Sequence, residues 1–249
     1  MQDLLGDKMK SFENIESDRR AVKGMPLMAR LDGRSFSAFT ANFARPYDTR
    51  LTNLMIDTTK FLVEKTQAVL GYTQSDEISL MWNVEEDSCS QYLFDGRFQK
   101  MTSILAAYAT GYFVSHLASA IPEKAGEIPL FDCRVWQVPT LMDAYSTFWW
   151  REKDAIKNSI TMAASTKFSH KALHGVNGQT KKAMLREVGI EFDDYPESFR
   201  HGTYIAPVTV QRMLTAEELD RIPVQYRPDG PVERKDVQII KFAHPSYQK

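Results

Sequence analysis

The chain has 249 residues, of which 43% are hydrophobic and 25% charged, and its formal net charge is −1. This length and composition predict a packed globular protein and exclude a largely disordered chain. The near-neutral charge also excludes the strongly basic composition of many nucleic-acid-binding domains, so any RNA contact must be local. The two cysteines, Cys89 and Cys133, lack metal-site or disulfide spacing, which indicates reduced thiols and favours a cytoplasmic protein.

The first expected strand ends in an acidic motif. An apolar run, Pro26-Leu27-Met28-Ala29, leads directly into Arg30-Leu31-Asp32-Gly33-Arg34 and predicts a strand near residues 25–31. Apolar side chains at helical spacing then predict a helix over residues 48–70, ended by Gly71.

A second acidic motif follows in a predicted turn. Residues 72–83 alternate apolar and polar side chains around Thr73-Gln74-Ser75-Asp76, which predicts two short strands joined by a turn. Asp76 lies in this turn. Glu77, the next residue of an extended segment, is expected to point the opposite way.

Two more elements complete the first half. The uncharged stretch 104–121 is interrupted by polar residues and barely long enough for a membrane span, so it predicts a buried helix, with His116 as a core histidine. Residues 131–138 predict another strand. This order of elements predicts an α+β, palm-type catalytic domain over residues 1–139, in which an antiparallel or mixed sheet carries helices on one face.

Residues 140–249 predict an extension that packs on the palm as part of the same structural unit. A long helical segment should reach about residue 174, and a shorter helix capped by Thr180 should end near Gly189. Thr215 is expected to cap another helix, and the proline-containing C-terminal tail after it is expected to wrap the surface.

The two acidic motifs together predict a metal site. Carboxylates at neighbouring strand ends are costly to bury unless cations neutralise them, and two divalent ions about 3.5–4 Å apart suit phosphoryl or nucleotidyl transfer. Asp32 and Asp76 are the predicted ligands, and the Gly33 carbonyl or amide is a candidate to face an ion or a phosphate. Glu77 would order the site from behind or bind through water. The alternative is that both motifs are ordinary surface turns.

Basic and aromatic side chains near these motifs are candidates for nucleotide contacts. Arg97 and Lys100 share one face at the start of the second helix, and Arg45 lies in a loop next to Pro46, before the first helix. The alternative for each is a solvated surface cation. Phe36 and Phe39 follow the first motif, where each is either a base-stacking ring or a core residue.

Several sequence blocks resemble, in order, those of the tRNA-His guanylyltransferase family over residues 5–205. They are Arg30-Leu31-Asp32-Gly33-Arg34-Ser35-Phe36, Phe43-Ala44-Arg45-Pro46-Tyr47-Asp48, Gly71-Tyr72-Thr73-Gln74-Ser75-Asp76-Glu77, Phe131-Asp132-Cys133-Arg134-Val135 and Arg200-His201-Gly202-Thr203. The resemblance implies a palm-fold nucleotidyltransferase that adds nucleotides to the 5′ end of tRNA in the 3′-to-5′ direction, using ATP or GTP to activate that end. Family members commonly form homotetramers, and no membrane contact is implied.

The resemblance also implies roles for individual residues. Asp32, Asp76 and Glu77 would be catalytic, and two Mg²⁺ ions would be held by Asp32, Asp76 and the Gly33 carbonyl. Nucleotide contacts are implied at Arg30, Gly33, Arg34, Ser35, Phe36, Ser37, Arg45, Ser75, Arg97 and Lys100, and tRNA contacts at Arg134, Asn158 and Lys181.

The chain departs from the family pattern at two places, and the second departure, the loss of a eukaryotic motif, resembles the family's bacterial, archaeal and viral "like" branch. Ser37 stands where the family usually has a histidine, which puts in doubt the activation-step role of that ring. Residues 156–162 replace a motif of the eukaryotic members, and only Asn158 of that motif remains. Because the branch favours template-dependent repair of truncated tRNA 5′ ends, we predict repair over untemplated addition of one G.

Two alternative functions stay open at this stage. A palm-fold nucleotidyl cyclase would act on a nucleoside triphosphate alone, since cyclases resemble the same palm with paired carboxylates. A catalytically silent RNA-binding palm is the other alternative. The presence of both acidic motifs argues against it, because carboxylates that repel one another without a metal destabilise their site.

Overall fold

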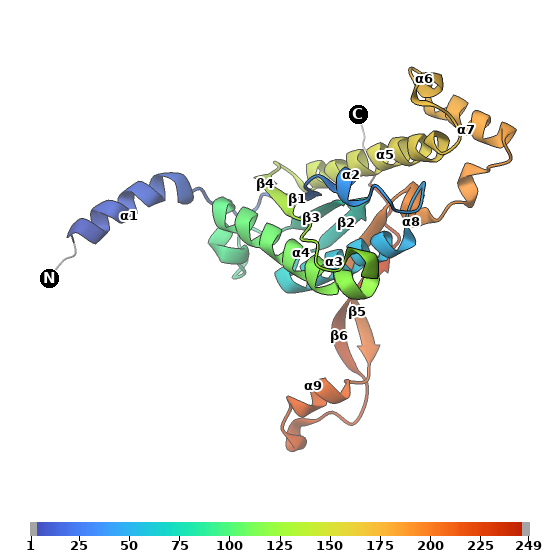
Figure 1. Ribbon diagram of the computed structural model, residues 1–249. Helices are drawn as coiled ribbons and strands as arrows, with labels where there is room; N and C mark the ends of the chain where they lie inside the picture. Colours follow the sequence, from blue (N-terminus) through green and yellow to red (C-terminus); the bar gives the residue numbers. More distant parts are fainter. Residues whose placement is uncertain (1–3, 246–249) are drawn as a thin grey trace.

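The fold is built on one antiparallel sheet of six strands. The structure is a computed structural model that describes residues 4–245, and its strand order is β4-β1-β3-β2-β5-β6 (Figure 1). The strands are β1 (Leu27–Gly33), β2 (Leu70–Gln74), β3 (Glu77–Trp82), β4 (Phe131–Gln137), β5 (Thr203–Arg212) and β6 (Val232–Ile240). The predicted α+β palm-type arrangement is confirmed. The extension shares the sheet, because β5 and β6 come from the second half of the chain.

Helices cover both faces of this sheet. On one face, α3 (Thr49–Thr66) and α4 (Phe98–Ala120) bury the larger apolar core, which includes Ile78 of β3. On the other face, α5 (Leu141–Ser165) packs through Phe148 against β2, β3 and β5. The helices of the first half therefore lie on one face, as predicted, and the extension supplies the helix for the other face.

The remaining helices are short or lie outside the two layers. They are α1 (Leu4–Ser17), α2 (Phe36–Phe39), α6 (His170–Leu173), α7 (Gly178–Glu187), α8 (Glu197–Arg200) and α9 (Ala216–Asp220). Figure 1 shows α1 standing clear of the sheet and its covering helices, and α6 and α7 continuing from the end of α5. The N-cap of α7 is Asn177, not the predicted Thr180, whose backbone amide instead donates to the Asn177 side chain.

The apolar stretch before residue 121 forms α4 and covers the sheet, as predicted. Met101, Leu105 and Phe113 of this helix are fully buried. Across residues 4–245, no helix combines the length and apolar character needed to cross a membrane. The prediction for His116 is wrong, because its side chain is exposed and its ring stacks on that of Tyr112 with centroids 4.1 Å apart.

The helix α3 is shorter than the apolar pattern predicted. It begins after Asp48, whose carboxylate accepts a hydrogen bond from the Arg50 amide at 2.9 Å, and it ends at Thr66. Gln67 then takes the left-handed conformation with φ 56° and turns the chain. The prediction that the helix reaches residue 70 is wrong, because the buried residues after this turn continue the apolar pattern into β2.

The C-terminal region forms an arm instead of wrapping the surface. β5 and β6 pair over nine positions, from Tyr204 opposite Ile240 to Arg212 opposite Val232, and project from the sheet with α9 at the tip (Figure 1). Thr215 caps α9 as predicted. The wrapping prediction is wrong, because the chain after Thr215 turns back through its prolines and returns as β6, which pairs with β5.

The end of the described chain is tied to α5. Glu152 of α5 accepts a hydrogen bond from the Tyr204 hydroxyl at 3.1 Å and lies 2.6 Å from His244 Nε2. His201 Nδ1 lies 3.2 Å from the other oxygen of the same carboxylate. The Phe242 ring stacks on Tyr204 with centroids 5.0 Å apart. One carboxylate of α5 therefore connects this helix to β5 and to the residues after β6.

Candidate active site

The two acidic motifs meet at one end of the sheet. Asp32 near the end of β1 stands opposite Glu77 at the start of β3 in the antiparallel register, and Asp76 occupies the turn just before Glu77. The Gly33 amide donates a hydrogen bond to the Asp76 carbonyl at 3.1 Å, which holds the turn against β1. Ser75 has φ 55°, a left-handed conformation that lets the turn close. The structure thus brings Asp32, Asp76 and Glu77 together.

The surroundings of Asp76 disfavour its charged form in the ion-free protein. Burial raises the pKa of Asp76, and repulsion from Asp32 raises it further, while the Ser75 hydroxyl, which donates to Asp76 at 3.0 Å, lowers it. In the part of the chain that the structure describes, no Lys, Arg or His side chain forms an ion pair with Asp32 or Asp76. A bound cation would relieve this repulsion.

The donor set fits Mg²⁺ only if a nucleotide completes it. Mg²⁺ is typically bound by one or two carboxylates together with waters and substrate phosphates. Asp32 and Asp76 supply such carboxylates, and no group of three or more His, Cys, Asp or Glu side chains among residues 4–245 is arranged to hold a metal alone. The Gly33 amide already donates a hydrogen bond to the Asp76 carbonyl and is not available for a phosphate. The Gly33 carbonyl therefore remains the candidate ligand for an ion.

Glu77 is held from the α5 side. Arg151 Nη2 donates to Glu77 Oε2 at 2.6 Å, and Arg151 Nε lies 2.6 Å from Oε1, with the two side chains only 14% and 18% exposed. Asp154 contacts the same guanidinium at 3.3 Å. Burial raises the pKa of Glu77, whereas Arg151 and then Arg30 lower it. Sequence reasoning missed Arg151, because nothing in the local sequence indicates that α5 crosses the acidic end of the sheet.

We expect Arg151→Ala to destabilise the fold by about 1–3 kcal/mol, because it leaves Glu77 largely buried without its partner. Glu77→Gln should cost less, and the double variant should recover much of the loss. Urea unfolding of the wild type, the two single variants and the double variant measures the coupling. Additive effects within about 0.5 kcal/mol would contradict the pairing.

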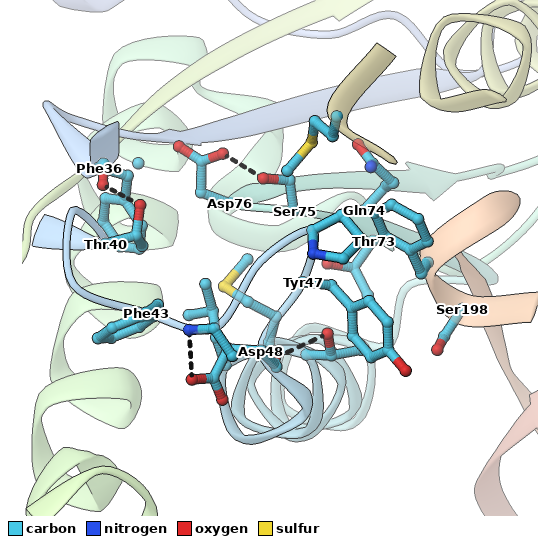
Figure 2. A pocket seen from close by; sticks show the side chains of 18 of the residues that line it. Phe36, Thr40, Phe43, Tyr47, Asp48, Thr73, Gln74, Ser75, Asp76 and Ser198 are labelled. Atoms are coloured by element: carbon cyan, nitrogen blue, oxygen red, sulfur yellow. Dashed lines mark hydrogen bonds between the residues drawn. The ribbon is translucent and has the colours of Figure 1, made fainter. Parts of the chain in front are cut away.

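A cavity of about 420 Å³ opens beside the acidic cluster. This volume lies within the range of roughly 300–1,000 Å³ for small-molecule sites. Figure 2 shows Asp76 and Ser75 on one side of the cavity and Phe43 and Asp48 facing them across it. The lining comes from the end of β1 and the loop after it, the start of α3, the β2–β3 turn, Met162 of α5, and the α8–β5 region. The cavity therefore has the size for a nucleotide, and Asp76 forms part of its wall.

The walls of the cavity combine flat apolar surface with a buried acid. Tyr47 stacks on Phe199 with ring centroids 5.0 Å apart. Asp48 is 7% exposed, and its hydrogen bond with the Arg50 side chain holds the pKa of its carboxyl below the usual value. A planar ring could pack on the aromatic wall while its N–H groups meet polar atoms. The sequence did not predict that residues of α3 and α8 line the cavity. Two of the blocks that resemble the family, Phe43–Asp48 and Arg200–Thr203, nevertheless flank these helices.

Seven of the predicted site residues line the cavity. They are Gly33, Ser35, Phe36, Ser37, Arg45, Ser75 and Asp76. Phe36 touches the cavity but is only 3% exposed and packs on Phe39, Phe113 and Phe131, so the core alternative holds for Phe36 and Phe39. Arg34 is exposed outside the lining.

Other predicted residues lie away from the cavity. Arg30 and the exposed Arg134 stand opposite each other on β1 and β4, on the face that carries Asp32. Arg97 and Lys100 are exposed at the start of α4, next to the residues that precede β1, and therefore near the other end of the sheet. In the α5–α7 region, Asn158 is exposed and Lys181 Nζ donates to Thr161 Oγ1 at 3.0 Å.

Comparison with known proteins decides the family. The sequence profile of the family described as tRNAHis guanylyltransferase matches residues 6–139, which include both acidic motifs and β4. This chain belongs to the tRNA-His guanylyltransferase family. The family is one of nucleotidyltransferases, so this chain is a nucleotidyltransferase with a palm fold.

Solved structures agree with this family membership. A bacterial tRNA-His guanylyltransferase-like protein in complex with ATP is 33% identical, covers 82% of this chain and 87% of its own, and has a TM-score of 0.75. A second bacterial protein of this kind, in complex with GTP, is 27% identical, covers 95% and 91%, and has a TM-score of 0.71. The tRNA-His guanylyltransferase of Saccharomyces cerevisiae is 28% identical over 72% of this chain and 81% of its own.

Proposed function

We propose that this protein adds nucleotides to the 5′ end of tRNA in the 3′-to-5′ direction, and that it repairs truncated 5′ ends by copying the opposing base. The observation that carries this proposal is the position of Asp76 in the lining of a nucleotide-sized cavity, with Asp32 close enough to repel its charge. A palm with acidic strand ends next to a nucleotide pocket is suited to transferring a nucleotidyl group between a triphosphate and a hydroxyl.

Two Mg²⁺ ions held by Asp32, Asp76 and the Gly33 carbonyl would neutralise the phosphates and the attacking oxygen when bound. The protein's own groups orient the substrate. Ser75 lines the cavity next to Asp76, and Arg45 lines it from the loop before α3, where its charge suits a triphosphate. Glu77, kept in place by Arg151, fits the role of ordering the site from behind.

ATP and GTP are the proposed nucleotide substrates. Two bacterial relatives have been solved with ATP and with GTP, respectively, and both superpose on most of this chain. The aromatic wall of the cavity provides a stacking surface for a base. Ser37, in the place of the family's usual histidine, lines the same cavity, so this departure falls within the proposed nucleotide site.

Contacts to tRNA are proposed at Arg134, Asn158 and Lys181. Arg134 and Asn158 are exposed, and half-buried Lys181 is close enough to α5 to bond Thr161. The preference for repair is supported by the loss of the eukaryotic motif in residues 156–162 of α5. The homotetramer implied by the family resemblance stays a prediction.

The proposal is tested with tRNAs that lack one 5′ nucleotide and carry each of the four bases opposite the gap. We expect the incorporated nucleotide to follow the opposing base, with ATP or GTP required for a 5′-monophosphate end. Addition of G whatever the opposing base would contradict template-dependent repair and leave untemplated guanylylation.

The cyclase alternative gives a different product in the same assay. Labelled GTP incubated with Mg²⁺ but without RNA should return unchanged if the protein extends tRNA. A cyclic nucleotide formed without RNA would replace the proposed function with a cyclase. Absence of any product with either substrate would favour the silent RNA-binding alternative.

A further inference from the structure

The helix α5 exposes two adjacent tryptophans on its outer surface. Trp149 is 38% exposed and Trp150 56% exposed, whereas Trp82 is buried and Trp136 is half-buried. Cations lie over both exposed rings. Lys153 Nζ lies 3.5 Å from the ring centroid of Trp149, and the Arg151 guanidinium carbon lies 4.8 Å from that of Trp150. Exposed rings of this size are unusual on a helix whose other face is already packed on the sheet.

The surface around these rings is locally basic. Trp149, Trp150, Lys153 and Lys157 form what we call the tryptophan strip, in which lysines follow the first ring at intervals of one helical turn. Neither lysine has an acidic partner within 4.0 Å in residues 4–245, and the acids of the same stretch are engaged elsewhere, Glu152 with two histidines and Asp154 with Arg151. Positive charge is therefore free here, although the whole chain has a net charge of −1.

Arg151 connects the strip to the acidic site. Its guanidinium packs against the Trp150 ring and at the same time binds the Glu77 carboxylate. Glu77 stands opposite Asp32 on the neighbouring strand. A single guanidinium therefore separates Trp150 from the acidic cluster. If a substrate reacts at Asp32, the part of that substrate next to the reacting group can reach the strip.

We propose that the tryptophan strip stacks the unpaired 3′ tail of the tRNA acceptor end. This inference rests on the proposed function, which places the base-paired 5′ end at Asp32 and Asp76 and so leaves the short 3′ tail as the nearest unpaired stretch of RNA. Exposed rings beside free cations are the usual platform for unpaired nucleotides. A protein partner fits less well, because lysine is depleted at protein–protein interfaces.

The test compares two probes on the full-length protein. One is an acceptor-stem RNA hairpin with a four-nucleotide 3′ tail, and the other is the same hairpin with a blunt end. We expect Trp149→Ala/Trp150→Ala to weaken binding of the tailed hairpin at least about fivefold per ring and to leave the blunt hairpin unchanged. Trp150→Phe should keep most of the binding. Tyr226→Ala removes a 72% exposed ring on the arm and serves as the matched control.

Intrinsic fluorescence gives a direct readout of stacking. An unpaired four-nucleotide RNA should quench the exposed tryptophans of the wild type but not the remaining emission of the double variant. The inference is overturned if the double variant binds both hairpins as the wild type does, or loses both equally. A changed oligomeric mass with unchanged RNA affinity would also overturn it and identify the strip as a protein contact.

Failure of the inference and failure of the proposed function are distinguishable. Wild-type protein that extends a truncated tRNA but binds tailed and blunt hairpins equally contradicts only the strip. Wild-type protein that binds the tailed hairpin through the strip but never extends a tRNA contradicts only the proposed activity.

Discussion

Asp76→Asn is expected to lower the rate of nucleotide transfer by roughly 10³-fold or more while leaving the protein folded. The amide keeps the shape of the side chain but removes the charge that would hold a divalent ion beside the cavity. Asp32→Asn should have an effect of similar size, since transfer through two ions needs both carboxylates. Single-turnover extension of a truncated tRNA at saturating Mg²⁺ measures the loss.

The substitution Asp76→Asn should make the protein more stable when no metal ions are bound. Asp76 is partly buried beside Asp32, so removing its charge should stabilise the metal-free protein by about 1 kcal/mol. Added Mg²⁺ and nucleotide should raise the melting temperature of the wild type but not of the variant. Asp57→Asn, at an exposed position of α3, is the matched control. Ordinary turnover in both Asp32→Asn and Asp76→Asn would show that the site assignment is wrong.

Gly33→Ala is expected to cost about 1–3 kcal/mol of stability and to lower activity about 10²-fold. A Cβ at this position would overlap the ring of Phe36. That ring cannot move aside, because Phe39, Phe113 and Phe131 surround it with centroid distances of 5.1, 5.7 and 5.2 Å. The backbone next to Asp32 must shift instead, which misplaces the proposed ligands. Urea unfolding and the extension assay measure the two effects.

A second substitution identifies the cause of the Gly33→Ala effect. If Phe36 is the obstacle, Gly33→Ala/Phe36→Leu should be less destabilised than the sum of the two single variants, with a coupling of about 0.5–3 kcal/mol. Gly111→Ala is the control for adding a methyl group, because a Cβ there meets nothing within 4 Å and the helix favours alanine. A Gly33→Ala protein as stable as the wild type would contradict the packing argument.

The local part of this structure could be predicted from the sequence. The turn that carries Asp76 is flanked by alternating strands, and α4 follows from an apolar run too interrupted to span a membrane. Such patterns indicate which segments form strands or helices and which side of each element is buried. They also placed Asp32 and Asp76 at strand ends, and the antiparallel register then brought those ends together.

The parts that depend on distant contacts could not be predicted. Nothing near Arg151 indicates that its partner is Glu77, because the two meet only once α5 has packed across the sheet. The cavity wall formed by Tyr47 and Phe199 has the same origin. The boundary of α3 was misjudged for a local reason, since the apolar periodicity continues through the turn at Gln67 into β2.

The link between Glu152 and His244 couples the residues after β6 to the acidic cluster through α5. Residues just before the C-terminus pack on α5 one residue away from Arg151, which in turn binds Glu77. Loss of the His244 side chain would therefore loosen the helix on which the acidic cluster depends. The helix α1, in contrast, stands clear of the sheet and has no buried residue, so substitutions within it should leave the acidic cluster undisturbed (Figure 1).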